Sequence, residues 1–228
     1  MGGAGDPGGY DGLLLDHDGV IVTLGDRDAL TRAAETALRR AGVADPPADV
    51  VETLRISVDP AELETAATRL GVEAAALWRH RDDAVAEALT AEARAGRKAP
   101  YRDADLLREV DLPLGVVSNN QTRVVEFVLE RYDLREAVET VHARAPNPES
   151  LARKKPAPTF LEESMAALGV ENPLYVGDSE SDVVAGRRAG LDVAFLRRPH
   201  RDGYDLGVTP DYDLDGLDGV LGLLGAPG

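Results

Sequence analysis

The stretch LLLDHDGV, residues 13–20, ends an apolar run in two aspartates, Asp16 and Asp18, followed by Gly19. Alternation along a strand would place Asp16 and Asp18 on one face, and Gly19 lets the chain turn just past them. Two adjacent carboxylates repel each other unless a divalent cation lies between them, and carboxylate and carbonyl oxygens are normal Mg2+ ligands. The segment alone allows two interpretations, a catalytic strand end or a turn whose aspartates bond local backbone N–H groups.

A second apolar run, LPLGVVSNN at residues 112–120, ends in the small polar residues Ser118 and Asn119. The following residues 122–134 have helical spacing, so the polar pair can be a helix N-cap. The functional alternative is a hydroxyl and an N–H donor placed to bind a phosphoryl oxygen.

A third segment, RKKPAPTF at residues 153–160, places Lys154 and Lys155 before Pro156. Lysine pairs are usually solvated surface. Lysine is scarce here, however, because Lys98 is the only other one in the chain. A lysine supplies a compact point charge suited to a phosphate.

A fourth segment, LYVGDSESDVVAGRRAGL at residues 174–191, leads an apolar run into Asp178, Ser179 and Asp182 and then into a helical pattern. Capping of the helix by Asp178 or Ser179 explains one acid. It explains the spaced acid pair less well.

The four segments, in this order, resemble the four motifs of the haloacid dehalogenase-like (HAD) hydrolase superfamily, whose members are mostly phosphatases. The resemblance extends over residues 10–198. It implies that Asp16 is the nucleophile, which forms an aspartyl-phosphate intermediate. It implies that Asp18 is the general acid and base. Ser118 and Lys155 would bind the transferring phosphoryl oxygens, with help from the Asn119 amide.

The same resemblance implies a magnesium site. Its ligands would be the carboxylates of Asp16 and Asp178 and the backbone carbonyl of Asp18, while Asp182 would act directly, through a water, or through Lys155. Cations and fixed hydrogen-bond donors are what an anionic phosphoryl-transfer transition state requires.

Three departures from the family pattern occur around the first motif. His17 stands where the family usually has an apolar residue, and alternation predicts that its ring points away from the carboxylates. Val20 occupies a position often held by threonine. The acid and hydroxyl that often follow are missing from IVTLGD, residues 21–26, which affects substrate contacts rather than the central chemistry.

Apolar runs that alternate with helical segments predict a doubly wound, Rossmann-like α/β fold with a parallel sheet. These runs lie at residues 10–15, 112–117, 138–141, 174–176 and 193–196. Ligand sites in such sheets lie beyond the carboxyl ends of the strands. The predicted core domain comprises residues 10–23 and 101–228, and residues 1–9 are predicted to be a disordered N-terminus.

Residues 24–100 read as helices without strands and resemble the helical cap that many HAD phosphatases insert at this point. A cap that closes excludes water and contacts the leaving group, which favours small-molecule phosphates as substrates. We expect Trp78 to belong to the cap core. Similarity to phosphoglycolate phosphatase-like members makes phosphoglycolate a possible substrate. Candidate residues for contacting the substrate are Arg55, Arg79, His80 and Arg81.

Composition narrows the classes of partner. The 228-residue chain has a net charge of −16 and a pI near 4.6, which disfavours nucleic acid and anionic membranes. Cysteine is absent, which excludes disulfides and thiolate zinc sites. We expect a cytoplasmic monomer or homodimer. The acidity favours a halophilic source, with a GC-rich genome as the alternative.

Two other functions stay open. A β-phosphoglucomutase-type phosphomutase is compatible with the first motif and would need a second phosphate site in the cap. A non-catalytic regulatory protein with the same fold is the other alternative. A dehalogenase fits less well, because Asp18 supplies acid/base and metal functions that such enzymes lack.

Overall fold

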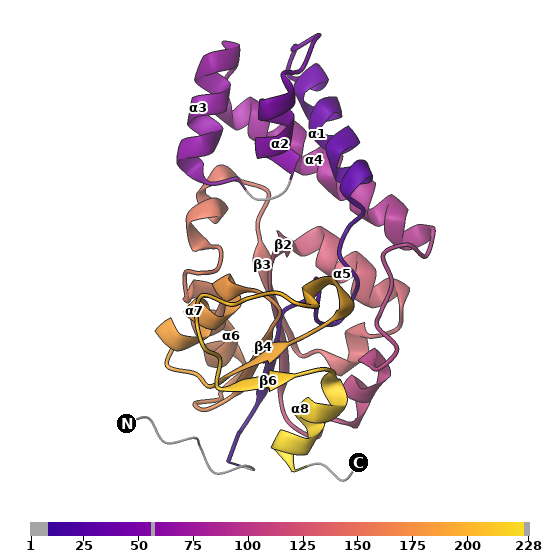
Figure 1. Ribbon diagram of the computed structural model, residues 1–228, viewed down its shortest axis with the longest axis vertical. Coiled ribbons are helices and arrows are strands. Elements are labelled where there is room, and N and C mark those ends of the chain that lie inside the picture. The colour runs from indigo at the N-terminus through magenta and orange to yellow at the C-terminus, as the bar shows by residue number, and fades with distance from the viewer. Residues whose placement is uncertain (1–8, 56–57, 226–228) are drawn as a thin grey trace.

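The computed structural model describes residues 9–55 and 58–225. The predicted disordered segment, residues 1–9, lies outside these residues except for Gly9. The described chain forms a sheet flanked by helices, with a group of helices over one end of the sheet (Figure 1). None of the described helices is both long and apolar enough to cross a lipid bilayer.

The sheet has six parallel strands in the order β3-β2-β1-β4-β5-β6. This confirms the predicted doubly wound α/β fold. The strands are β1 (Leu13–Leu15), β2 (Leu114–Gln121), β3 (Thr140–Arg144), β4 (Leu174–Gly177), β5 (Val193–Leu196) and β6 (Tyr212–Leu214). Strand β6 was not predicted, because it is a short, partly exposed edge strand within an acidic stretch.

The sheet is the middle of three layers because consecutive residues of a strand face opposite sides. Leu13 and Leu15 of β1 pack with α5 and α8, whereas Leu14 packs with α6 and α7. Both faces are therefore covered, which explains why the central strands are apolar throughout. These helices are α5 (Thr122–Arg131), α6 (Thr159–Leu168), α7 (Glu180–Arg188) and α8 (Leu217–Leu224). Short 3-10 helices are η1 (Ala104–Glu109), η2 (Arg135–Ala137), η3 (Pro148–Arg153) and η4 (Pro199–Arg201).

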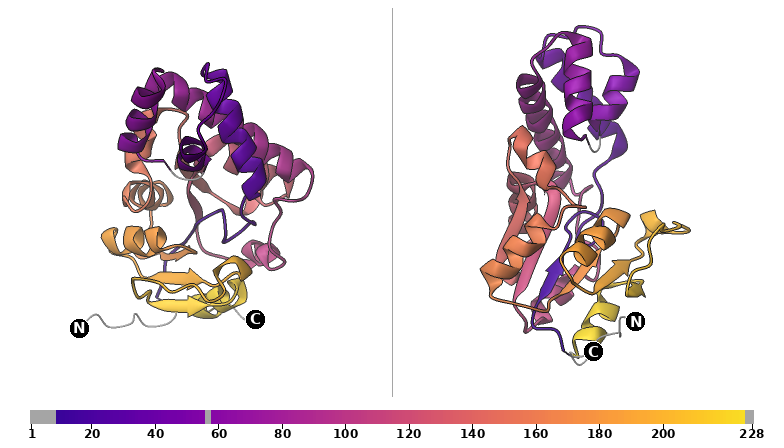
Figure 2. Two further views of the ribbon diagram at one scale, coloured as in Figure 1. Left: turned by 45° about the horizontal axis from the view of Figure 1, so that its top comes forward. Right: turned by 90° about the vertical axis from the view of Figure 1, so that its left-hand side faces the viewer.

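Four helices and no strand occupy the described part of residues 24–100 (Figure 2). They are α1 (Arg27–Arg40), α2 (Ala48–Arg55), α3 (Pro60–Leu70) and α4 (Ala74–Arg94). Local signals set their starts: Asp26 caps α1, and Asp59 and Glu62 form a capping box at α3. The helices enclose an apolar cluster that includes Trp78 and is joined by Leu151 of η3. The division into core and cap domains stays a prediction.

Two chain segments connect these helices to the sheet, and they pair with each other. The Thr23 N–H donates to the Ala99 carbonyl at 2.9 Å, and Val22 forms a bridge with Pro100. The connection is therefore a short two-stranded hinge close to Asp18, which also bridges to Val22.

Candidate active site

The carboxyl ends of β1, β2 and β4 bring the predicted site residues Asp16, Ser118 and Asp178 to one edge of the sheet. Strand β1 lies between β2 and β4, with Leu15 opposite Val116 and Val176. Asp16 follows directly, and its N–H donates to the Val176 carbonyl at 2.8 Å. Because parallel strands end on the same side, residues that are about 100 positions apart in sequence become neighbours.

Lys155 lies at the centre of this edge. Its ammonium group is buried and lies 2.9 Å from Asp16 Oδ1 and 2.7 Å from Asp182 Oδ1. It also donates to the Val117 carbonyl at 3.1 Å and to the Tyr175 hydroxyl at 3.0 Å. Burial by itself would lower the pKa of Lys155, but the two carboxylates raise it above its usual value. The lysine therefore remains a fixed positive charge.

Asp182 is saturated with hydrogen bonds. Its Oδ1 accepts from the Tyr175 hydroxyl at 2.6 Å as well as from Lys155. Its Oδ2 accepts from the Ser179 hydroxyl at 2.5 Å and the Ser179 N–H at 3.0 Å. Burial opposes ionisation, but Lys155 and these donors hold the pKa of Asp182 below its ordinary value. Among the three predicted routes for Asp182, this geometry favours action through Lys155.

The pKa of Asp16, unlike that of Asp182, is raised above its ordinary value. Burial raises the pKa of Asp16; Lys155 opposes this effect, while Asp182 and Asp178 add to it. The backbone N–H of His17 also donates to Asp16 Oδ1 at 2.7 Å. One lysine therefore does not fully compensate the carboxylates around Asp16, which is the situation in which a divalent cation is stabilising.

The donor set fits Mg2+. Asp16, Asp178 and Asp182 are buried, and each offers an oxygen within 4.8 Å of the others. Clustered carboxylate oxygens are the ligands that Mg2+ prefers. Gly19 is required beside them: its φ is 89°, and a Cβ there would lie 2.3 Å from Asp178 Oδ2. The turn after β1 is therefore shaped around the Asp178 carboxylate.

Two residues after β5, which sequence reasoning missed, also contact Asp178. His200 Nε2 lies 2.6 Å from Asp178 Oδ2, and the Arg201 Nε–H donates to the same oxygen at 3.2 Å. Both belong to the η4 region, which reaches the site because β5 ends at the same edge of the sheet. They hold the carboxylate in place, and the Arg201 guanidinium offsets part of its charge.

Asp18 is held by groups from three parts of the chain. Lys98 donates to its Oδ1, and the Asn120 amide donates to its Oδ2 at 2.6 Å. Lys98 also donates to the Thr23 carbonyl in the hinge at 2.9 Å. Burial would raise the pKa of Asp18, but Lys98 and His17 together lower it well below its ordinary value. Sequence reasoning missed Lys98 at this position, although the scarcity of lysine was a usable signal.

The expectation for the direction of the His17 ring was wrong. Its Nδ1 lies 3.1 Å from Asp18 Oδ1, although alternation predicted that the ring would point away from the carboxylates. The reason is that the strand ends at Leu15, so the two-residue periodicity does not extend to His17. Burial lowers the pKa of His17, which favours the neutral ring.

Asn119 and Ser118 have different roles in the geometry. The Asn119 amide is bonded to the backbone of Lys155: its Oδ1 accepts from the Lys155 N–H at 2.8 Å, and its Nδ2 donates to the Lys155 carbonyl at 3.0 Å. Asn119 thus fastens the segment that carries the lysine. The buried Ser118 hydroxyl accepts from the Asn120 N–H at 3.1 Å and still has a proton to donate.

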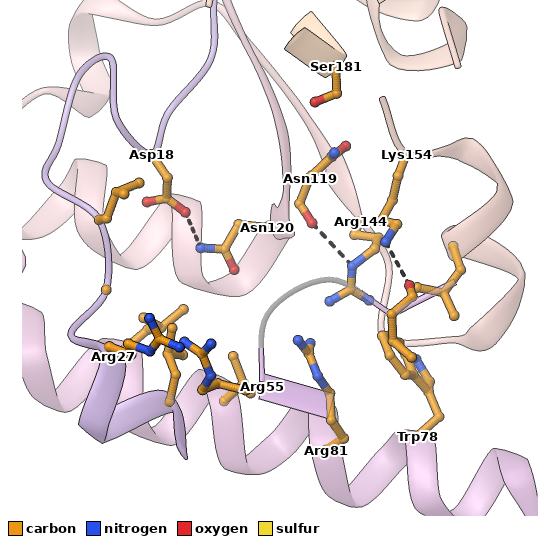
Figure 3. Close-up of a pocket in the computed structure, with 17 residues that line it drawn as sticks. Asp18, Arg27, Arg55, Trp78, Arg81, Asn119, Asn120, Arg144, Lys154 and Ser181 are labelled. Carbon is orange, nitrogen blue, oxygen red and sulfur yellow. Dashed lines mark hydrogen bonds between the residues drawn. The ribbon is translucent and has the colours of Figure 1, made fainter. Parts of the chain in front are cut away.

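A cavity of about 500 Å³ lies between this edge of the sheet and the four helices. Asp18 and Asn120 lie on one side of it, and Arg81, Arg144 and Lys154 lie across from them (Figure 3). Of the predicted substrate-contacting residues, Arg55 and Arg81 line this cavity, whereas Arg79 and His80 are absent from its lining. Trp78 is buried among the helices, as expected, and also lines the cavity.

The comparison with protein families is consistent with this arrangement. The model of the haloacid dehalogenase-like hydrolase family matches residues 104–196, which include the second, third and fourth segments. The chain is similar to that family over these residues, which are less than half of its length. It is 27% identical over 124 residues to a phosphoglycolate phosphatase of Photorhabdus laumondii, an alignment that covers 53% of this chain and 51% of the relative. It is 26% identical over 128 residues to the pyrophosphatase PpaX of Oceanobacillus iheyensis, covering 55% and 58%.

Solved structures share the fold over nearly the whole chain. The structure of CbbY from Rhodobacter sphaeroides in complex with phosphate has a TM-score of 0.70 at 20% identity, covering 94% of this chain and 99% of CbbY. A predicted phosphoglycolate phosphatase from Haemophilus somnus has a TM-score of 0.62 at 20% identity, covering 93% and 96%. In sequence, the chain spans about half the length of the curated relatives it matches.

Proposed function

We propose that this protein is a Mg2+-dependent phosphatase that hydrolyses a small-molecule phosphomonoester through an aspartyl-phosphate intermediate. The observation that carries the proposal is the position of Lys155, whose ammonium group bridges Asp16 and Asp182 beside the third carboxylate, Asp178. A nucleophilic carboxylate next to a fixed cation and a metal-binding acid cluster is what phosphoryl transfer to a protein side chain requires.

In the first step, a carboxylate oxygen of Asp16 attacks phosphorus and the bond to the leaving oxygen breaks. The Lys155 ammonium and the Ser118 hydroxyl donate to the phosphoryl oxygens as negative charge moves onto them. Asn119 supports this step indirectly, because it fixes the backbone of Lys155. Without such cations, the attacking carboxylate and the phosphate would repel each other.

Asp18 acts as the acid in the first step and as the base in the second. It protonates the leaving oxygen, then removes a proton from the water that hydrolyses the intermediate. In the geometry described, Lys98 and His17 stabilise the carboxylate, which is the form required for the second step. A bound phosphate beside Asp18 raises the pKa of this carboxyl group by repulsion, which favours the protonated form required for the first step.

The residues that would hold Mg2+ are Asp16, Asp178 and the backbone carbonyl of Asp18, while Asp182 acts through Lys155. When bound, the ion supplies positive charge that stabilises the phosphoryl oxygens and offsets the repulsion among the carboxylates. The shape that Gly19 leaves for the Asp178 carboxylate supports this assignment.

A small-molecule substrate is supported by the cavity of about 500 Å³ that Asp18 lines. We assign residues 24–100 as a cap, because their helices form the far wall of that cavity and join the sheet through the paired hinge. Similar proteins are named phosphoglycolate phosphatase and pyrophosphatase, and CbbY has been solved with xylulose 1,5-bisphosphate. Phosphoglycolate and sugar phosphates are therefore the first substrates to examine.

The test is release of inorganic phosphate from 4-nitrophenyl phosphate by the purified protein, with Mg2+ or with EDTA. We expect hydrolysis that depends on Mg2+ and is abolished by Asp16→Asn. Asp105→Asn is the matched control, because Asp105 is exposed and pairs with Arg108 rather than with a residue of the site. Equal rates with and without Mg2+, or full activity of Asp16→Asn, would overturn the proposal. With a hexose 1-phosphate as the substrate, isomerised sugar phosphate in place of free phosphate would instead indicate a phosphomutase.

A further inference from the structure

Three cationic side chains gather on the wall of the cavity that faces Asp18 (Figure 3). Arg81 comes from α4, Arg144 ends β3, and Lys154 precedes Lys155. We call these three residues the cationic cluster. They come from three separate elements, so their meeting at one place is a property of the tertiary structure.

The two arginines of the cluster pack against Trp78. The guanidinium carbons of Arg144 and Arg81 lie 4.7 Å and 5.2 Å from the centroid of the indole ring. Both arginines are almost fully buried. Packing on an aromatic ring positions a guanidinium group. Its N–H donors, which lie in the plane of the guanidinium group, stay available to other acceptors.

Backbone carbonyls hold two members of the cluster in place. The Arg81 Nε–H donates to the Leu54 carbonyl at 3.0 Å, and the Lys154 ammonium donates to the Val58 carbonyl at 2.8 Å. Such bonds orient a cation without cancelling its charge. The Arg144 Nε–H also donates to the Asn119 carbonyl at 3.3 Å, which ties the cluster to the segment that carries Ser118.

The carboxylate of Asp82 is shared by two of the three cations. Its Oδ1 lies 2.6 Å from Arg144 Nη2 and 3.8 Å from Arg81 Nη1. Burial and repulsion from neighbouring cations of the cluster lower the pKa values of Lys154 and Arg81. Burial, Arg144 and Arg81 together lower the pKa of Lys154 to about 8, against the opposing effect of Asp59 and Glu62. Burial and Arg144 lower the pKa of Arg81 to about 10.

An unused hydrogen-bond donor lies in the same wall. The Trp78 indole nitrogen is buried and has no hydrogen-bond partner among the residues that the structure describes. Buried donors are nearly always bonded, so an orphan in a cavity wall indicates a group that is supplied from outside. Two buried arginines that share one carboxylate beside a half-buried lysine are also costly unless an anion compensates them, even though the chain as a whole carries a charge of −16.

We propose that the cationic cluster of Arg81, Arg144 and Lys154 binds an anionic group on the leaving-group part of the substrate. The inference rests on the proposed phosphatase function and adds a substrate class to it: a phosphomonoester whose leaving group carries a carboxylate or a second phosphate. Asp18 and the cluster line opposite sides of one cavity, so such a substrate would have its scissile bond at Asp18 and its second anion at the cluster.

The first test compares substrates with the wild-type protein. In the neutral arm the leaving group carries no charge, and the substrates are 4-nitrophenyl phosphate and glycerol 1-phosphate. In the anionic arm the leaving group carries a carboxylate or a second phosphate, and the substrates are 2-phosphoglycolate and fructose 1,6-bisphosphate. We expect kcat/KM to be at least about tenfold higher in the anionic arm, which corresponds to about 1.4 kcal/mol of transition-state binding. The better of the two anionic substrates distinguishes a carboxylate from a phosphate. Equal values in the two arms would overturn the inference.

The second test uses Arg81→Gln and Lys154→Gln, with Arg79→Gln as the matched control. Arg79 lies on the same helix as Arg81 but is exposed and does not line the cavity. We expect the ratio of kcat/KM between the anionic and neutral arms to fall by about tenfold in the first two variants, mainly through KM, and to be unchanged in the control. An unchanged ratio in Lys154→Gln would contradict the inference.

Failure of the inference and failure of the proposed function give different results. If 4-nitrophenyl phosphate is hydrolysed with Mg2+ but the substrate ratio is insensitive to the cluster, only the inference is wrong. If no phosphomonoester is hydrolysed, both are wrong. Should Arg81→Gln not fold, the wild-type substrate comparison and Lys154→Gln, which changes a less buried side chain, still decide the question.

Discussion

Two buried clusters of charged side chains differ in the sign of their charge. The carboxylates of Asp16, Asp178 and Asp182 surround one lysine, whereas on the cavity wall Arg81 and Arg144 share the Asp82 carboxylate near Lys154. The carboxylate cluster attracts a cation and the cationic cluster attracts an anion. Buried charges of one sign, when packed around too few counter-charges, thus indicate the sign of the ligand.

The largest effect on activity is expected from Asp16→Asn. The amide cannot serve as the nucleophile, so we expect kcat to fall by at least about 1000-fold. Burial raises the pKa of the native Asp16 carboxyl, so its ionised form is costly and its replacement by a neutral amide should not lower the melting temperature. Phosphate release and thermal unfolding measured on one preparation test this. A large drop in melting temperature would show that Asp16 is structural.

Lys155→Met should lower both activity and stability. It leaves Asp16 and Asp182 buried without their shared cation, and breaking a buried ion pair on one side typically costs about 3–5 kcal/mol. Chemical denaturation with and without Mg2+ measures this cost, and we expect the ion to restore part of it. If stability is unchanged, the carboxylate cluster does not need its lysine, and the contrast between the two clusters fails.

Lys98→Met should have an intermediate effect. Lys98 is fully buried and links Asp18 to the Thr23 carbonyl in the hinge, so its loss leaves Asp18 poorly positioned. General acid–base catalysis contributes about 100- to 10,000-fold, and we expect a loss of about 100-fold. The loss should be greater for phenyl phosphate than for 4-nitrophenyl phosphate, because the better leaving group needs less protonation. An equal loss for both would contradict this role.

The smallest expected effect concerns pH. Because the pKa of Lys154 is lowered to about 8, this lysine is charged at pH 7 and largely neutral at pH 9. The preference for anionic leaving groups should therefore decrease by a few-fold between these values. The ratio of kcat/KM between the anionic and neutral arms is measured at each pH, because the ratio cancels pH effects that both arms share. Lys154→Gln, which has no charge to lose, should abolish this change.

The site residues at the strand ends could be predicted from the sequence, because the end of a strand is a local feature. An apolar run followed by small polar residues marks Asp16, Ser118 and Asp178 without knowledge of any partner. The doubly wound fold then followed from the alternation of such runs with helical segments, and the structure confirmed it. The exception was β6, whose short run in an acidic stretch lacks the apolar signal of a buried strand.

Contacts within the site were predicted less well where they depend on distant parts of the chain. The pair between Lys98 and Asp18 joins residues that are 80 positions apart. His200 and Arg201 reach Asp178 only because β5 ends at the same edge of the sheet. The ring of His17 turned toward Asp18 because the strand had already ended, which no periodicity could reveal.

The amino-acid sequence alone determined the class of fold, the order of the four motifs and the residues from which a phosphoryl-transfer site can be built, because hydrophobic periodicity and strand-end chemistry are local. Only the tertiary structure decided which charges face each other across the cavity. Arg81, Arg144 and Lys154 carry no common pattern along the chain, and their shared place arises from the packing of α4, β3 and the segment before Lys155 around Trp78.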